Sequence, residues 1–345
     1  MTFDEMYSDM SDKLKNLVPE IEIKYKAELA YKIHQLKLER NALILGHNYM
    51  EPALYYSIPD FVGDSLELAR KSAKTDKDII IFCGVKFMAE TAKILNPDKK
   101  VLLPSLEAEC SLASSITVED VRALKKKYPG VPVVTYINTY AEIKAESDIC
   151  CTSGNAAHII ESLKADEIIF IPDEYLARNV ARETNKKIIF PANGDNNIDD
   201  SHMIKYDLIG WKGRCEVHEK FTVEDIKNVR DQYPHAAILS HPECSPEVVE
   251  ASDFSGSTSA MIKYVGETDA QNYLLLTECS MGDNIVAANP HKKMISLCSV
   301  RCQHMNRITL EDTYNSLVYD QYEIQIPEMI LQKAYKAVNN MMEMV

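Results

Sequence analysis

The stretch LEAECSLASSITVEDVRALKKKYPGVPVVTYIN, residues 106–138, has a second version, WKGRCEVHEKFTVEDIKNVRDQYPHAAILSHPE, at residues 211–243. Both contain a cysteine, then Thr-Val-Glu-Asp, then Tyr-Pro and an apolar run, with equivalent positions 105 residues apart. The same offset relates DICCTS at 148–153 to DFSGST at 253–258. One chain therefore repeats one structural unit.

A third copy of the unit lies upstream. LILGHNY at 43–49 corresponds to VVTYIN, and DFVGDS at 60–65 corresponds to DICCTS. In each copy an apolar run and a Lys-Lys pair follow, with the pairs at 99–100, 186–187 and 292–293. Each unit is predicted to be a helix, an apolar strand, a polar loop, a helix, a second apolar strand, a helix and a Lys-Lys strand.

Short apolar strands that alternate with helices are typical of parallel sheets covered on both faces. We therefore predict an α/β protein with three homologous three-layer αβα domains, which have short parallel sheets and pseudo-threefold symmetry around a central site. The predicted segments are residues 1–115 (first repeat with N-terminal helices), 116–220 (second repeat), 221–317 (third repeat) and 318–345. The last segment is predicted to be a C-terminal helix packing back on the body, with apolar positions Met329, Ile330, Ala334, Ala337, Val338 and Met341.

The composition is that of an ordinary soluble globular protein, with 46% apolar and 26% charged residues among 345. The net charge of −14 argues against a nucleic-acid partner. No run approaches the roughly 18 apolar residues of a membrane span, and the N-terminus lacks an apolar signal segment. We expect a cytoplasmic protein without a membrane partner. In a reducing compartment its nine cysteines suggest metal ligands or thiols.

Each Lys-Lys pair is followed by a loop that contains a cysteine. Cys110, Cys215 and Cys302 lie 10, 28 and 9 residues past the pairs. If the three domains pack around a pseudo-threefold axis, the three thiolates converge there. Structural zinc normally takes four ligands, whereas a [4Fe–4S] cluster with three cysteines leaves one iron open as a Lewis acid. A single cysteine is more often a small buried apolar side chain, so the prediction depends on the equivalence of the three.

The first strand of each unit ends in two polar residues at positions i and i+2, which lie on one face of a strand. The pairs are His47 and Tyr49, Tyr136 and Asn138, and His241 and Glu243. Ligands bind at the carboxyl ends of parallel strands. We therefore predict a ring of proton donors and acceptors that faces the open iron, with loop capping as the alternative.

Hydroxyl groups follow the next loop of each unit, at Ser65, Ser153, Ser257 and Thr258. They can cap helices, and together with free backbone N–H groups they can bind anions. Such sites would let an acidic chain bind carboxylates and phosphate. His218, three residues past Cys215, is expected beside the cluster or on the substrate.

The chain resembles the quinolinate synthase family over nearly its full length. The motifs are GHNY, DFVGDSLELAR, FMAETAKILNPDKKVLLP, YINTYAEIKAESD, CTSGNA, HPEC and GST. The resemblance implies a transferase of NAD biosynthesis that condenses iminoaspartate with dihydroxyacetone phosphate to quinolinic acid, releasing phosphate and water. It implies a functional link to an aspartate oxidase or dehydrogenase, and a [4Fe–4S] cluster at the junction of three similar domains.

Residue roles follow from the same resemblance. Cys110, Cys215 and Cys302 are the implied cluster ligands. Tyr49 and Glu243 resemble acid–base groups, assisted by His47 and His241. The implied substrate-binding residues are His47, Ser65, Tyr136, Asn138, Ser153, His218, His241, Glu243, Ser257 and Thr258.

The chain departs from some family members in one spacing. They have a Cys-x-x-Cys before the last ligand, whose oxidation is linked to control, whereas here the spacing is Cys298-x-x-x-Cys302. Three alternatives stay open: a sister three-cysteine enzyme acting on isoprenoid diphosphates or S-adenosylmethionine, an iron–sulfur redox sensor, and structural metal binding. Substrate assays separate the first from quinolinate synthesis. A sensor needs an effector surface such as a basic helix, and structural binding predicts zinc without activity.

Overall fold

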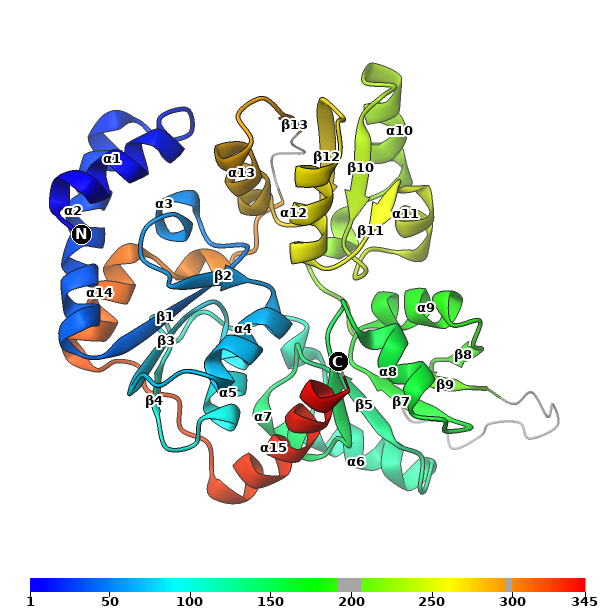
Figure 1. Ribbon diagram of the computed structural model, residues 1–345. Coiled ribbons are helices and arrows are strands. Elements are labelled where there is room, and N and C mark those ends of the chain that lie inside the picture. The colour runs from blue at the N-terminus through cyan, green and yellow to red at the C-terminus, as the bar shows by residue number, and fades with distance from the viewer. Residues whose placement is uncertain (192–205, 296–299, 345) are drawn as a thin grey trace.

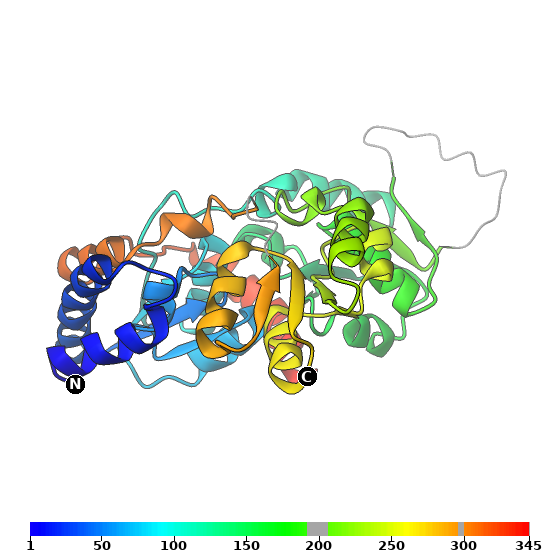
Figure 2. The same ribbon diagram turned by 90° about the horizontal axis from the view of Figure 1, so that it is seen from above.

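The computed structural model describes residues 1–191, 206–295 and 300–344, and contains three separate parallel sheets flanked by helices (Figure 1). This confirms the predicted α/β class with short parallel sheets. Each sheet with its helices forms one lobe, and the three lobes lie next to one another in Figure 1. The view turned by 90° shows that together they form a flat body (Figure 2). Cys298 lies outside the described residues.

The first sheet has the strand order β2-β1-β3-β4. Its strands are Phe61–Gly63 (β2), Ala42–His47 (β1), Ile79–Cys83 (β3) and Lys100–Leu102 (β4). Every residue of β1 and β3 is buried. The continuous apolar character of these two strands is what a central parallel strand with helices on both faces requires.

The third sheet repeats this order as β11-β10-β12-β13. Its strands are Phe254–Ser255 (β11), Ala237–Ser240 (β10), Asn272–Leu276 (β12) and Lys293–Ile295 (β13). The first residues of the Lys-Lys strands pair equivalently, since Lys100 pairs with Ile79 and Lys293 with Asn272. The repeat found in the sequence is therefore a repeat of sheet topology.

The second sheet differs, with five strands in the order β6-β5-β7-β9-β8. They are Ile149–Cys151 (β6), Val133–Tyr136 (β5), Ile168–Ile171 (β7), Leu208–Gly210 (β9) and Ile188–Ile189 (β8). The predicted Lys-Lys strand, β8, does not pair with β7. Instead β9, at the end of the long insertion, takes the fourth position and moves β8 to the edge. The predicted Lys-Lys strand of this copy therefore exists, but it lies at the edge of the sheet and not beside β7.

Helices cover these sheets and connect the strands. Their bounds are Phe3–Leu14 (α1), Glu20–Glu39 (α2), Pro52–Tyr55 (α3), Ser65–Ala73 (α4), Lys86–Leu95 (α5), Val118–Lys127 (α6), Ala141–Ala145 (α7), Ala156–Ser162 (α8), Glu174–Glu183 (α9), Val223–Gln232 (α10), Pro246–Ala251 (α11), Thr258–Glu267 (α12), Cys279–Ala288 (α13), Leu310–Tyr319 (α14) and Glu328–Glu343 (α15). Single 3₁₀ turns lie at Ala113–Ser115 (η1), His218–Lys220 (η2) and Met305–Arg307 (η3). In the described part of the chain, no helix has the length and hydropathy of a membrane span.

A cysteine loop, a 3₁₀ turn and a capped helix recur three times. The helices α6, α10 and α14 begin after Thr117, Thr222 and Thr309, and each threonine hydroxyl accepts the N–H of an aspartate three residues on. The third of these starts, Thr309-Leu310-Glu311-Asp312, was not recognised in the sequence. Its helix, α14, packs on α2 and β3 and so returns to the first lobe.

The C-terminal helix α15 packs on α7, β6 and α5, and so joins the first two lobes. Its buried residues are Leu331, Ala334, Ala337, Val338 and Met341. The prediction was wrong for Met329, which is 71% exposed, because Leu331 takes the inward position in the first turn. The four segment limits given above stay a prediction.

Candidate active site

One cavity is lined by residues from all three lobes. Its walls bring together most of the residues predicted from the sequence: Cys110, Cys215, Cys302, His47, Tyr49, Ser65, Tyr136, Asn138, Ser153, His218, His241, Glu243 and Thr258. Ser257 is the exception. Its hydroxyl caps α12 and donates to Asp64 Oδ2 at 2.9 Å, so it joins the first and third lobes beside the cavity.

The cysteine side of the cavity has threefold regularity. Each sulfur accepts backbone N–H groups from residues two and three positions further along, at the start of its 3₁₀ turn. The thiol of Cys110 interacts electrostatically with Cys302, and that of Cys215 with Cys110. Three sulfurs from three lobes, each with the same N–H donors, therefore meet at one wall.

Burial raises the pKa of the Cys110 thiol to about 12 and that of Cys302 to about 11, and it raises the pKa of Cys215 as well. A bound cation is needed to hold such thiols as thiolates near neutral pH. Hydrogen bonds to sulfur are one of the protein's means of tuning an iron–sulfur cluster. The donor set and its surroundings thus fit a metal cluster with three cysteine ligands.

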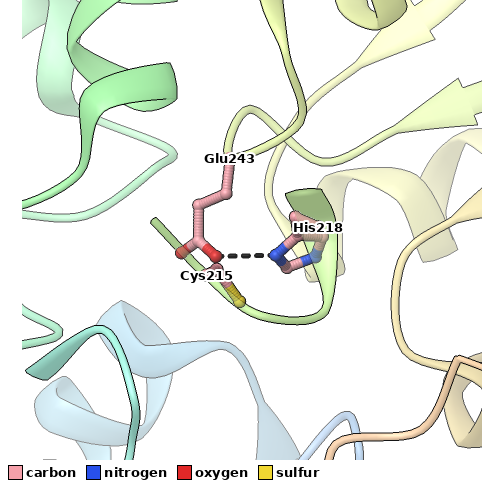
Figure 3. Close-up of side chains that lie close together, drawn as sticks. All are labelled: Cys215, His218 and Glu243. Atoms are coloured by element: carbon pink, nitrogen blue, oxygen red, sulfur yellow. Dashed lines mark hydrogen bonds and ion pairs between the residues drawn. The ribbon is translucent and has the colours of Figure 1, made fainter. Parts of the chain in front are cut away.

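A second combination of ligand atoms lies in the same wall. One atom each from Cys215, His218 and Glu243 lies within 4.8 Å of the other two, a spacing that could hold a metal ion. Figure 3 shows Cys215 and His218 on one loop, with Glu243 reaching His218 from another. Because His218 Nδ1 already lies 2.7 Å from Glu243 Oε2, these two groups satisfy each other.

Opposite the cysteine side, the cavity is lined by residues at the ends of the strands, and Glu243 is the centre of this strand-end side. Its Oε1 accepts from Tyr136 Oη at 2.5 Å and from Asn138 Nδ2 at 3.2 Å, and its Oε2 faces His218 Nδ1. Burial by itself would raise the pKa of this carboxyl, but the imidazoles of His218 and His241 and the hydrogen bonds lower it to about 2. Glu243 is therefore a buried carboxylate that stays ionised.

The two strand-end histidines are held in the same way. His47 Nδ1 accepts the N–H of Tyr49 at 3.2 Å, and His241 Nδ1 accepts the N–H of Glu243 at 3.3 Å. Burial lowers the pKa of both imidazoles to about 3, so both are neutral at pH 7. With Nδ1 accepting, the ring proton is on Nε2, which in His241 lies 3.3 Å from Ser153 Oγ.

The cavity can recognise anions without a cationic side chain. Among its described lining residues there is no lysine or arginine. Instead, Ser65 and Thr258 stand at the first positions of α4 and α12, where the helix dipole favours negative charge. Part of each helix start is already capped: Asp64 accepts the N–H groups of Leu66 and Glu67, and Ser257 accepts that of Ala260. The two neutral imidazoles add ring N–H donors. Carboxylate and phosphate groups are the ligands that such a lining suits.

Three buried polar residues were missed in the sequence: Thr277, Asp173 and Glu278. Each lies just after the second apolar strand of its unit, whereas the polar pairs predicted from the sequence lie at the end of the first. Asp173 and Glu278 lie 105 residues apart and cap α9 and α13, so the repeat offset could have found them. Burial raises the pKa of Asp173, and raises that of Glu278 to about 7.

Three lobes that share one cavity at the carboxyl ends of their strands define an α/β enzyme whose active site needs all three. The family model described as Quinolinate synthetase A protein matches residues 31–343. The chain therefore belongs to the quinolinate synthetase A family, and the resemblance seen in the sequence is confirmed.

Curated relatives carry names in agreement with this family. The chain is 48% identical to "Quinolinate synthase" of Caulobacter vibrioides (strain NA1000 / CB15N) over 96% of its own length and 86% of the relative. It is 46% identical to "Quinolinate synthase" of Agrobacterium fabrum over 97% of this chain and 91% of the relative. It is 49% identical to "Quinolinate synthase" of Xylella fastidiosa over 90% of this chain and 85% of the relative.

Proposed function

We propose that this protein is a quinolinate synthase of NAD biosynthesis, a transferase that condenses iminoaspartate with dihydroxyacetone phosphate to quinolinic acid and releases phosphate and water. The observation that carries the proposal is the shared cavity. In a chain of this family, three repeat-equivalent cysteines and the ring of strand-end acids, bases and hydroxyls line the same space. An aspartate oxidase or dehydrogenase would supply iminoaspartate, in the cytoplasm.

Cys110, Cys215 and Cys302 would hold a [4Fe–4S] cluster with one open iron. When bound, such a cluster supplies a Lewis acid for a substrate hydroxyl or carboxylate. The protein's own contribution is the three neighbouring thiols, each with backbone N–H groups that favour its ionised form.

Glu243 and Tyr49 are the proposed base and acid. The condensation removes protons from carbon and delivers protons to leaving oxygens, and both tasks need groups that hold opposite protonation states at one pH. Glu243 is ionised, as described above. Burial raises the pKa of Tyr49 well above its usual value, so its hydroxyl keeps its proton for donation.

Substrate binding is assigned to neutral donors. The Nε2–H groups of His47 and His241, with the hydroxyls of Ser65, Ser153 and Thr258, would bind the carboxylates and the phosphate. Tyr136, Asn138 and His218 hold Glu243 in place. Ser257 would act indirectly, through the hydrogen bond that its hydroxyl donates to Asp64 at the boundary between two lobes.

The decisive experiment is purification without oxygen, followed by iron, sulfide and zinc analysis and an assay with iminoaspartate and dihydroxyacetone phosphate. We expect about four iron and four sulfide per chain, with quinolinate formed. A cluster without quinolinate would point to a sister enzyme. One zinc per chain would favour the Cys215, His218 and Glu243 group as a single-metal site and would overturn the proposal.

A further inference from the structure

The side chain of Tyr140 lies against the loop that carries Cys110. Tyr140 stands between β5 and α7 of the second lobe, whereas the loop follows β4 of the first sheet. Tyr140 Oη lies 3.2 Å from Ser114 Oγ and interacts with the backbone N–H of Cys110. The ammonium group of Lys86, the first residue of α5, lies 4.9 Å from the centre of the Tyr140 ring. One side chain of the second lobe thus contacts the first ligand loop and the helix start beside it.

Two backbone hydrogen bonds hold each cysteine loop in the same way. The carbonyl two residues before the cysteine accepts the N–H of the first residue of α5, α9 or α13, and the cysteine's own carbonyl accepts the N–H four residues further on. The donors before the cysteine are Lys86, Glu174 and Cys279, and those after it are Ser114, Glu219 and Asn306. Each of the three cysteines is therefore held by the backbone on both sides.

In the first loop, Tyr140 contacts the residues that make both of these bonds. The N–H of Lys86 lies 2.7 Å from Ala108 O, and its ammonium group faces the Tyr140 ring, to which a cation is attracted. The N–H of Ser114 lies 3.0 Å from Cys110 O, and its hydroxyl is bonded to that of Tyr140. Tyr140 therefore links the two backbone bonds that hold Cys110.

Helix capping does not explain a tyrosine at this position. Tyr140 stands at the N-cap of α7, where Ser, Thr, Asp and Asn are the usual residues, and its side chain makes no cap hydrogen bond. The residue 105 positions later, Ser245, stands at the N-cap of α11 and accepts the N–H of Val248. The second lobe thus has a side chain at this position that reaches the Cys110 loop in place of one that caps the helix.

We propose that Tyr140 is a positioning residue that holds the Cys110 ligand loop in place from the second lobe. This inference rests on the proposed function, in which Cys110 is a cluster ligand. The hydroxyl of Tyr140 holds the turn after Cys110, and its ring holds the helix start that anchors the loop before it. Groups that orient metal ligands without binding the metal contribute to metal affinity. Loss of Tyr140 should therefore loosen Cys110 and leave Cys215 and Cys302 as they are.

The test compares Tyr140→Phe, which removes the hydroxyl and keeps the ring, with Tyr140→Leu, which removes both. Tyr128→Phe is the matched control, because Tyr128 is also a half-buried tyrosine of the second lobe and its hydroxyl makes no hydrogen bond within the described part of the chain. All four proteins, parent included, are prepared without oxygen and with their cluster. Each is mixed with an iron chelator and iodoacetamide. Iron release is followed by absorbance, and the cysteines that are alkylated first are identified by mass spectrometry.

We expect iron release to be roughly 10-fold faster in Tyr140→Leu and roughly threefold faster in Tyr140→Phe, with Cys110 alkylated before Cys215 and Cys302 in both. Tyr128→Phe should match the parent. If Tyr140→Leu does not fold, the nearly isosteric Tyr140→Phe decides the test. Parent-like release in the Tyr140 variants, or faster release with all three cysteines alkylated together, would overturn the inference alone. A parent that holds no iron would overturn the proposed function first, and this role with it.

Discussion

The two sides of the cavity come from the same repeat but differ in how strictly they repeat. On the cysteine side, all three units supply the same residue, the same backbone N–H donors, a 3₁₀ turn and a threonine cap. On the strand-end side, equivalent positions hold three different pairs: His47 and Tyr49, Tyr136 and Asn138, and His241 and Glu243.

The difference reflects what each side would bind. A cluster with three equivalent ligand positions requires the same ligand from each unit, so the three side chains are identical. The strand-end side would instead bind two dissimilar substrates and transfer several protons. These tasks require different side chains, because an acid and a base cannot be the same residue in the same environment. Substitutions on the two sides of the cavity should therefore have different effects.

On the cysteine side, replacement of any one of the three cysteines should have the largest effect. We expect Cys110→Ala, Cys215→Ala or Cys302→Ala to remove the cluster and all activity, because two thiolates cannot hold it in place. Iron and sulfide analysis and the visible spectrum of protein prepared without oxygen measure this. Cys83→Ala and Cys244→Ala are controls, since both cysteines are buried outside the cavity lining. A full cluster in Cys302→Ala would refute the threefold argument.

The strand-end side should lose turnover and keep the cluster. We expect Glu243→Gln to lower kcat by about 10²- to 10⁴-fold with normal iron content, because it removes a positioned base without removing a thiol. Glu90→Gln is the control: Glu90 is also buried, but it accepts the N–H of Ala141 between α5 and α7. Loss of iron in Glu243→Gln would instead make Glu243 part of the metal site.

The two neutral histidines should make the fold sensitive to acid. Burial lowers the folded-state pKa of His47 and His241 to about 3, below the ordinary 6.5. The unfolded chain therefore binds more protons as pH falls below 6.5, and stability is lost between pH 6.5 and about 3. By pH 5 this costs roughly 2 kcal/mol per histidine.

Denaturant unfolding at pH 7.5 and pH 5 measures this acid sensitivity. Between pH 7.5 and pH 5, the free energy of unfolding of His47→Gln should fall by about 2 kcal/mol less than that of the parent. His241→Gln should behave in the same way, because its ring is held as that of His47 is. The control is His235→Gln at an exposed position, which should lose as much unfolding free energy between the two pH values as the parent does. Equal losses in His47→Gln and the parent would show that the buried ring is protonated in the folded state.

The smallest effect concerns the three threonine caps behind the cysteine loops. Thr117→Ala, Thr222→Ala and Thr309→Ala should each lower the free energy of unfolding by about 1 kcal/mol, because each leaves a helix N–H without its hydroxyl acceptor. Replacement by Ser should restore most of it. A much larger loss at one cap than at the other two would show that the cysteine-side units are not equivalent.

Much of the fold was predictable because its signals are local and repeated. Apolar runs separated by helix starts indicate short parallel strands, and a fixed offset identifies equivalent loops. The same reasoning does not predict the strand order of the sheet that contains the long insertion. Nothing in the sequence near Lys187 shows that a strand at Leu208–Gly210 will pair with β7 and displace β8 to the edge.

The sequence by itself determined the three lobes, the three equivalent cysteines and the strand-end positions, because these depend on patterns within about a hundred residues. Tertiary structure alone decided the partners of those residues. Tyr49 and Thr277 are 228 positions apart, and Tyr136 and Glu243 are 107 apart. Whether a buried carboxyl is ionised, like Glu243, or has a raised pKa, like Asp173, depends on donors that only lobe packing brings within reach.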